Sequence, residues 1–405
     1  MAKQHIITAL DIGSGSVKIL SVCKNEAGFE VLAKHEEPSL GIRRGVVVNV
    51  SQVSETISSL VRKAEQDCGT KIDRVYANIG GGHISSVSSR GLVSVSRADR
   101  KISEEDVDRV IQAAKTLPLY SNQEIIQVFP KEFIVDGQAG LKNVVDMEGV
   151  RLEAETLLLC GFPPYIKNSS KTILASGIEV SELIPDPLAS SKSVLTSREK
   201  ELGVCVLDIG SGTTGMAVYE ESNLIHAAIF PVGSGHITND IAICLKTDID
   251  TAEKIKLEYG VSKEVHKKQD KKSDKKIKLG GDDDLEFSPK LLIDIIDARV
   301  LEIFNLANKE LKNISKQGKL PAGVVLTGGG AKLPGIRDLA KKELKLPCRI
   351  GTPKELVGFQ AEPGLATLCG LALEGFDIEN DSNNPSVKKR GFGKRLINLF
   401  RTFVP

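Results

Sequence analysis

Two aspartates, Asp11 and Asp208, stand in the same hexapeptide, Leu-Asp-Ile-Gly-Ser-Gly, at residues 10–15 and 207–212. A carboxylate followed by closely spaced glycines suits a metal-bound polyphosphate. The carboxylate holds Mg²⁺ through water, and the glycines let backbone N–H groups approach phosphate oxygens. One such loop alone is more often an ordinary tight turn, but two identical copies about half a chain apart make coincidence the weaker explanation. We therefore expect a nucleotide with Mg²⁺ between two related domains, with Asp11 and Asp208 acting on the metal through water.

Each glycine loop is flanked by apolar runs typical of strands on both sides, which describes a hairpin. This excludes a dinucleotide-binding fold, where the glycine loop opens a helix, and the chain has no G-x-x-x-x-G-K-[ST] motif. The hairpins offer backbone N–H, hydroxyl and ammonium donors to phosphate. The predicted phosphate-binding residues from them are Gly13, Ser14, Gly15, Ser16, Lys18, Gly210, Ser211, Gly212, Thr213 and Thr214.

A third glycine cluster follows the strand-like run that ends at Thr327 and precedes a helix-like segment over residues 336–344. A strand–glycine–helix junction allows close backbone approach and presents a positive helix end to a nucleotide. The residues predicted to bind adenosine here are Gly328, Gly329, Gly330 and Lys332.

Strand-like and helix-like segments alternate, which predicts an α/β fold. Helical spacing indicates helices over residues 51–65, from Ser103 onward, and over residues 290–312. Two segments have too few apolar residues to pack: residues 263–284 are expected to be a mobile lysine-rich loop, and residues 379–389 a flexible linker.

The charge balance and the termini narrow the class of protein. Lys+Arg 54 against Asp+Glu 53 gives a net charge of +1, so we expect no nucleic-acid partner. The N-terminus has no signal-peptide pattern, and no run approaches the ~18 apolar residues of a membrane span. We expect a protein of the cytoplasm.

The C-terminal segment is amphipathic. On a helical wheel, the bulky apolar residues of 391–404 fall within an arc of about 160°, and the basic residues lie opposite. Such a helix lies in the interface of an anionic membrane. A helix packed on the protein's own core is the alternative, but the preceding linker and basic flanks favour a membrane. The predicted membrane-binding residues are Phe392, Lys394, Arg395, Leu396, Ile397, Leu399, Phe400, Arg401 and Phe403.

The three glycine elements, in this order, resemble those of the actin/Hsp70/sugar-kinase ATPase superfamily. Further stretches resemble the FtsA family of bacterial cell-division actin homologues: residues 77–85 with 90–91, 188–191, 201–204, 235–242 and 349–353. The resemblance implies an actin-like fold, that is, duplicated RNase H-like domains around a nucleotide cleft, with one small subdomain replaced by a differently placed one. It also implies ATP binding, filament formation, and binding to the C-terminal tail of the tubulin-like protein FtsZ, alongside other division proteins.

The resemblance further implies a division into subdomains and roles for single residues. Gly233, Gly235 and Thr238 would lie near the phosphates, Glu253 and Lys256 near adenosine, and Arg299 would pair with the acidic FtsZ tail. The implied subdomains are 1–84 with 163–193 (1A), 85–162 (1C, the replaced one), 194–243 with 320–378 (2A), 244–319 (2B), a linker at 379–390 and the membrane helix at 391–405.

Two departures from the superfamily pattern bear on hydrolysis. Gly215 stands where an acidic residue is common in the superfamily. Asp186 lies near the place where relatives that hydrolyse ATP often carry an acid or amide that positions the attacking water. We predict nucleotide binding with slow hydrolysis at best. The alternatives are a kinase or phosphohydrolase of the superfamily and an actin-like protein of type IV pilus assembly. The amphipathic tail and residues 238–240 favour a division protein at the cytoplasmic face of the cell membrane, at the septum.

Overall fold

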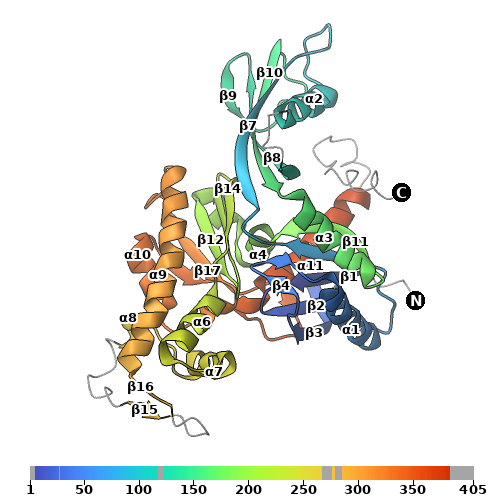
Figure 1. The fold of residues 1–405 in the computed structure, drawn as a ribbon. Coiled ribbons are helices and arrows are strands. Elements are labelled where there is room, and N and C mark those ends of the chain that lie inside the picture. Colours follow the sequence, from blue (N-terminus) through green and yellow to red (C-terminus); the bar gives the residue numbers. More distant parts are fainter. Residues whose placement is uncertain (1–4, 27, 117–121, 267–275, 279–284, 384–405) are drawn as a thin grey trace.

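The computed structural model describes residues 5–26, 28–116, 122–266, 276–278 and 285–383. Most of its strands belong to two sheets, each built around one copy of the repeated hexapeptide (Figure 1). The first sheet has the spatial order β11-β6-β1-β2-β3-β19 and contains β1 (Ile6–Ile12), β2 (Ser16–Asn25), β3 (Gly28–Pro38), β6 (Arg74–Ile79), β11 (Glu179–Pro185) and β19 (Leu356–Val357). The second has the order β18-β17-β12-β13-β14-β7-β10-β8-β9. Its first five strands are β12 (Val204–Ile209), β13 (Thr214–Glu220), β14 (Asn223–Phe230), β17 (Val324–Thr327) and β18 (Cys348–Ile350).

The two halves share one strand topology, as their repeated hexapeptide predicts. In the first half, β1 is antiparallel to β2, which is antiparallel to β3, while β6 and β11 continue the sheet in parallel on the other side of β1. In the second half, β12, β13, β14, β17 and β18 repeat these relations in the same order. The chain is therefore a structural duplication.

The remaining strands of the second sheet come from a segment inserted in the first half: β7 (Ser85–Ser94), β8 (Glu124–Val135), β9 (Gln138–Leu141) and β10 (Arg151–Gly161). Helix α2 (Glu104–Lys115) packs on them and begins at a capping box between Ser103 and Asp106. Strand β7 joins the second half by pairing Ser85 with Ala228 of β14. The Ser86 hydroxyl accepts a hydrogen bond from the Ala227 N–H at 3.0 Å. The inserted strands thus extend the sheet of the other half (Figure 1).

Helices cover both faces of the central strands β1 and β12, so these strands are buried and read as apolar runs. The longer helices are α1 (Val50–Cys68), α3 (Pro163–Ala175), α4 (Asp186–Val194), α6 (Ser234–Leu245), α7 (Ile249–Tyr259), α9 (Pro289–Asn313), α10 (Ile336–Leu344) and α11 (Ala366–Asn383). The shorter elements are α5 (Ser197–Leu202), α8 (Lys263–His266), η1 (Gly329–Lys332), η2 (Pro363–Leu365), β4 (Ile42–Arg43), β5 (Val46–Val47), β15 (Ile277–Lys278) and β16 (Glu286–Phe287).

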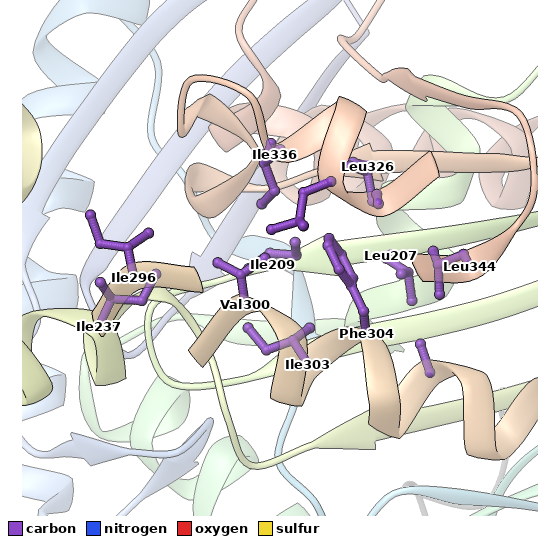
Figure 2. Packing of buried hydrophobic residues seen from close by; sticks show 14 of the residues in the cluster. Leu207, Ile209, Ile237, Ile296, Val300, Ile303, Phe304, Leu326, Ile336 and Leu344 are labelled. Carbon is purple, nitrogen blue, oxygen red and sulfur yellow. The ribbon is translucent and has the colours of Figure 1, made fainter. Parts of the chain in front are cut away.

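The layers follow from the side chains that each sheet face buries. Helices α1 and α3 pack on one face of the first sheet, and α11 and α4 on the other. Helix α4 also reaches the second sheet, so α4 and α11 lie between the halves. The outer face of the second sheet packs on α6, α9 and α10, where Leu207 and Leu326 meet Phe304 (Figure 2).

Helices α4 and α11 cross at very close range because Gly370 has no side chain. A Cβ built on Gly370 would lie 1.7 Å from the carbonyl oxygen of Ala189. This contact fixes α4 against α11, the two helices that lie between the halves. Ala189 belongs to α4, and the first residue of that helix is Asp186.

Two predictions about unpacked segments are wrong in part. Residues 263–266 form α8, and Lys263 donates its backbone N–H to the Asp297 carboxylate of α9. Strand β15 pairs with β16. The predicted linker is helical as far as Asn383, where α11 ends, because Glu379 accepts a hydrogen bond from the Tyr76 hydroxyl at 3.2 Å and contacts His5. These long-range partners are not visible in local composition.

The predicted membrane helix at 391–405 and most of the predicted linker lie outside the described residues. Among the helices that the structure does describe, none is both long and apolar enough to cross a bilayer.

Candidate functional site

The two glycine hairpins meet face to face across the boundary between the halves. Each closes as a tight turn: Gly13 N–H donates to the Ser16 carbonyl at 3.1 Å, and Gly210 N–H to the Thr213 carbonyl at 2.9 Å. A Cβ on Gly15 would lie 2.9 Å from Ser211 Cβ, and a Cβ on Gly212 would lie 2.6 Å from Ser14 Oγ. Glycine in one loop thus opposes serine in the other, reciprocally. The structure brings both predicted loops to one place.

The N-terminus of α6 supports the second loop. The N–H groups of Ser234 and Gly235 donate to the carbonyls of Gly210 and Ser211, both at 2.8 Å. A Cβ on Gly233 would lie 2.5 Å from the Gly210 carbonyl oxygen, so only glycine fits there. Gly233 and Gly235 therefore lie against the predicted phosphate loop.

Asp11 and Asp208 are the next-to-last residues of the equivalent strands β1 and β12, and both are buried. Asp11 pairs in register with Lys18, whose ammonium is 3.4 Å from its carboxylate. Asp208 pairs instead with Gly215, the residue equivalent to Lys18 in the second repeat. Pro187 of α4 lies against Gly215, 3.2 Å from where a Cβ would be, which leaves little room for a side chain. Asp208 consequently lacks the local ammonium that Asp11 has, and accepts a hydrogen bond from Thr367 at 2.7 Å.

A third carboxylate, Asp186, faces the same region from the start of α4. Its Oδ1 accepts a hydrogen bond from Asn78 Nδ2 at 2.8 Å, and a Cβ on Gly80 would lie 2.4 Å from its Oδ2. Asn78 in turn accepts from the backbone N–H of Ile12 at 2.6 Å. A side chain of β6 therefore connects the end of β1, directly before the first glycine hairpin, to Asp186.

These carboxylates carry more negative charge than their surroundings balance. Burial, reinforced by Asp11, raises the pKa of Asp208 to about 6. Burial and the charges of Asp11 and Asp208 also raise the pKa of Asp186, against the hydrogen bond from Asn78. Lys18 does not neutralise the group, because it also interacts with Glu36.

A divalent cation fits this charge arrangement. No group of three or more His, Cys, Asp or Glu side chains in the described part of the chain could ligate a metal directly. The fit is therefore to a hydrated Mg²⁺ that the carboxylates hold through water.

The third glycine cluster closes over the second repeat. A Cβ on Gly328 would lie 2.4 Å from Asp208 Oδ1, and one on Gly330 would lie 2.5 Å from Ile209 Cγ2, whereas nothing lies within 4 Å of one on Gly329. Gly329 and Gly330 begin the turn η1, which precedes α10, so the glycines open this short turn and not the helix itself as expected. Lys332 forms an ion pair with Glu362.

Thr238, Glu253 and Lys256 come together between α6 and α7. Lys256 Nζ donates to Thr238 Oγ1 at 2.8 Å and lies 2.7 Å from the Glu253 carboxylate, which also accepts from the Thr238 hydroxyl. Thr238 is buried. The group lies one helical turn beyond the start of α6.

Arg299 lies on α9 and not in any of the glycine clusters. Its guanidinium makes a two-pronged contact with Asp240 of α6 at 2.7 and 2.8 Å and also pairs with Glu302. These residues line an open groove of ≈ 500 Å³ between α6 and α9, together with Cys244, Asp294, Ile295 and Ala298. A ligand of Arg299 must therefore compete with Asp240.

Asn78 and its contact with Asp186 were not predicted from the sequence. A signal was present, because Asn78 is followed by three glycines at residues 80–82, much as Thr327 is followed by three at residues 328–330. Both glycine runs follow the parallel strand next to the hexapeptide strand of their half. The duplication thus extends to a second pair of glycine clusters.

Comparisons with known proteins bear on the identity of the chain. A family model described as cell division protein FtsA matches residues 205–370, and one described as the SHS2 domain inserted in FTSA matches residues 81–160. The chain is 34% identical to a cell division protein FtsA of Neisseria meningitidis serogroup B, over 99% of this chain and 98% of that relative.

Solved structures share the fold at low sequence identity. The chain is similar to one in a PilM–PilN type IV pilus biogenesis complex, with a TM-score of 0.65, 17% identity, and coverage of 92% of this chain and 99% of that one. It is also similar to MreB5 of Spiroplasma citri bound to ADP, with a TM-score of 0.57, 12% identity, and coverage of 94% and 99%. These likenesses confirm the predicted actin-like fold, with the FtsA-type inserted domain.

The pilus alternative rests on fold alone, whereas the match to division proteins extends along the sequence at a much higher identity. The chain belongs to the FtsA family of cell division proteins.

Proposed function

We propose that the chain binds ATP with Mg²⁺ in the cleft between its halves and connects the FtsZ ring to the membrane during division. The observation that carries the nucleotide site is the pair of glycine hairpins, which meet beside three carboxylates that exceed their local counter-charge. MreB5, which shares the fold, binds ADP.

In this proposal, backbone N–H groups of residues 13–18 and 210–214 bind the phosphates, and the loop tips separate to admit them. Asp11 and Asp208 hold water ligands of Mg²⁺, which neutralises the phosphate charge. Residues 328–332 and the Thr238 group flank adenosine. Residues 1–84 with 163–193 and 194–243 with 320–378 form the two nucleotide-binding subdomains, and residues 85–162 and 244–319 form the smaller ones. Hydrolysis is slow at best, because Gly215 supplies no carboxylate.

Two neighbouring glycines test the site. Gly329→Ala adds a methyl group into open space, so we expect wild-type stability with weakened ATP binding, whereas Gly330→Ala meets Ile209 and is expected to lower the melting temperature. Isothermal titration calorimetry with Mg·ATP and thermal unfolding measure the two effects. Unchanged ATP affinity in Gly329→Ala would argue against adenosine near this turn.

The groove between α6 and α9 is the proposed site for the acidic FtsZ tail. Arg299→Ala leaves Asp240 without its guanidinium, so the groove becomes more negative and we expect at least about tenfold weaker binding of an FtsZ tail peptide. Arg337→Ala, an exposed arginine on α10, is the control and is expected to bind normally. Fluorescence anisotropy with a labelled peptide measures both, and equal affinities would move the FtsZ site elsewhere.

The segment at 391–405 is the proposed membrane anchor, and attachment to anionic lipids places the protein at the cytoplasmic face of the septal membrane. The six basic residues from Lys388 to Arg401 each contribute about 1 kcal/mol near an anionic surface. A truncation ending at Pro385 is expected to remain in the supernatant when the full chain sediments with anionic liposomes. Filament formation with ATP strengthens the attachment through avidity. Equal sedimentation of both proteins would remove the anchor from this proposal.

A further inference from the structure

Asn78 is a buried residue whose amide is hydrogen-bonded at both ends. It is 5% exposed, near the end of β6. Its Oδ1 accepts from the N–H of Ile12, directly before the first phosphate loop, at 2.6 Å. Its Nδ2 donates to Oδ1 of Asp186 at 2.8 Å. The side chain thus joins the end of β1 to the start of α4.

The orientation of this amide follows from its partners. A backbone N–H can only donate, so the oxygen of the amide must face Ile12 and the NH₂ group must face Asp186. The Asp186 carboxylate therefore faces a donor, the Asn78 amide, whose orientation is fixed. This donor stabilises the charge of Asp186, which the charges of Asp11 and Asp208 disfavour.

The equivalent position in the second half shows what a purely structural link looks like. Leu10 pairs with Ala77 and Leu207 with Leu326, so Asn78 and Thr327 occupy corresponding places on β6 and β17. The Thr327 hydroxyl donates to the carbonyl of Gly351, the first residue after β18, at 3.0 Å. Asp186 is likewise the first residue after β11. In each half, the side chain at or near the end of one strand (β6 or β17) therefore bonds to the residue that directly follows the neighbouring strand (β11 or β18).

The first half makes this link with a carboxylate, where a backbone carbonyl suffices in the second. A carboxylate among other carboxylates is an unfavourable choice for structure alone. We propose that Asn78 is a positioning residue that holds the Asp186 carboxylate beside Asp11 and Asp208, where it takes part in binding hydrated Mg²⁺ with ATP. This inference deepens the proposed nucleotide site and rests on it.

An exchange of the two residues separates positioning from structure. In Asn78→Asp, two carboxylates face each other, and the melting temperature is expected to fall. The double variant combines Asn78→Asp with Asp186→Asn. Its carboxylate on β6 still accepts from the Ile12 N–H, and it now also accepts from the new amide at the start of α4, so the hydrogen bond between positions 78 and 186 returns with its direction reversed. We expect the double variant to recover most of the lost thermal stability.

The nucleotide readout is the gain in ATP affinity on adding Mg²⁺, measured by calorimetry with Mg²⁺ and with EDTA. Asp186→Asn and the double variant are both expected to lose about tenfold or more of this gain, as typically happens when residues that orient metal ligands are replaced. If the double variant had both the stability of the wild type and its gain in ATP affinity on adding Mg²⁺, the position of the carboxylate would not matter for the metal. Asn78 would then have a structural role only. A double variant no more stable than Asn78→Asp would contradict the hydrogen-bonded pair itself.

The proposed function fails in a different way. If the wild-type protein binds no ATP, the nucleotide site is wrong. The stability comparison of the single and double variants still decides whether Asn78 positions Asp186.

Discussion

Asp208→Asn is expected to make the protein more stable at neutral pH when no nucleotide is present, and to remove most of the stabilisation that Mg·ATP provides. Asp208 is 9% exposed, and it pairs in register with Gly215, whereas Asp11 in the first half pairs with Lys18. Asp208 therefore has no ammonium group at the paired position. Asparagine has the same shape and keeps an oxygen for the Thr367 hydroxyl, but carries no charge. The substitution therefore removes a buried charge with little change in packing.

The pH dependence has a definite sign. Burial raises the folded-state pKa of Asp208 to about 6, from an unfolded value of 3.8. Between these values the folded protein binds more protons than the unfolded chain, so the free energy of unfolding falls as the pH rises through this window. The loss is complete above pH 6 and amounts to about 3 kcal/mol. Asp208→Asn should therefore match the wild type near pH 4 and exceed it at pH 7.5.

The same substitution at Asp106 is a control with the opposite sign. Asp106 is buried, but hydrogen bonds from Ser103 and Ser96 and the Arg109 guanidinium outweigh burial and hold its pKa below the usual range. Its stabilisation is present above the unfolded pKa and is lost as the pH falls, so Asp106→Asn should destabilise at pH 7.5. Thermal unfolding from pH 4 to 8, with and without Mg·ATP, measures both variants. An Asp208→Asn protein less stable than wild type at pH 7.5 would contradict the assigned charge imbalance.

Gly370→Ala is expected to be among the most damaging single-methyl changes in the protein. The added carbon would overlap the backbone of α4 at Ala189, which cannot move aside as a flexible side chain can. Over-packing typically costs about 1–3 kcal/mol and occasionally more, and an overlap with backbone atoms belongs at the upper end of this range. Helix propensity alone predicts the reverse, because alanine is favoured over glycine inside a helix by about 1 kcal/mol.

Gly329→Ala provides the matched comparison, because it adds the same methyl group where nothing lies within 4 Å. Chemical denaturation should therefore show a large loss of stability for Gly370→Ala and none for Gly329→Ala. Because α4 begins with Asp186, Gly370→Ala should also weaken Mg·ATP binding in whatever fraction remains folded. Wild-type stability in Gly370→Ala would mean that α4 and α11 are farther apart than described here.

The sequence predicts the features that rest on local pattern. The repeated hexapeptide predicts a duplicated fold with two hairpins, since strand, glycine turn and strand follow each other in the chain. Helix α2 begins where its capping residues predict, and α9 runs from Pro289 close to its expected end. These elements are set by residues a few positions apart.

Features that depend on distant residues were missed or wrong. Glu379 is helical rather than part of a linker because it meets Tyr76, 303 positions away in the sequence. The link between Asn78 and Asp186 likewise joins β6 to the residue after β11, and these two strands are adjacent only in the fold. The absence of an acid at Gly215 is explained by Pro187, which only the packing of α4 brings there. Spacing in the chain carries none of this information.

The pairing of β7 with β14 limits how the halves can move. The inserted domain belongs to the first half by chain connection and to the second by hydrogen bonding, and Lys142 adds a contact to the Glu221 carbonyl at 2.8 Å. The halves are therefore joined by this strand seam as well as by helices α4 and α11. Any movement of one half relative to the other would have to deform both junctions. A force applied to the inserted domain thus acts on both halves at once, because the domain is bonded to each of them.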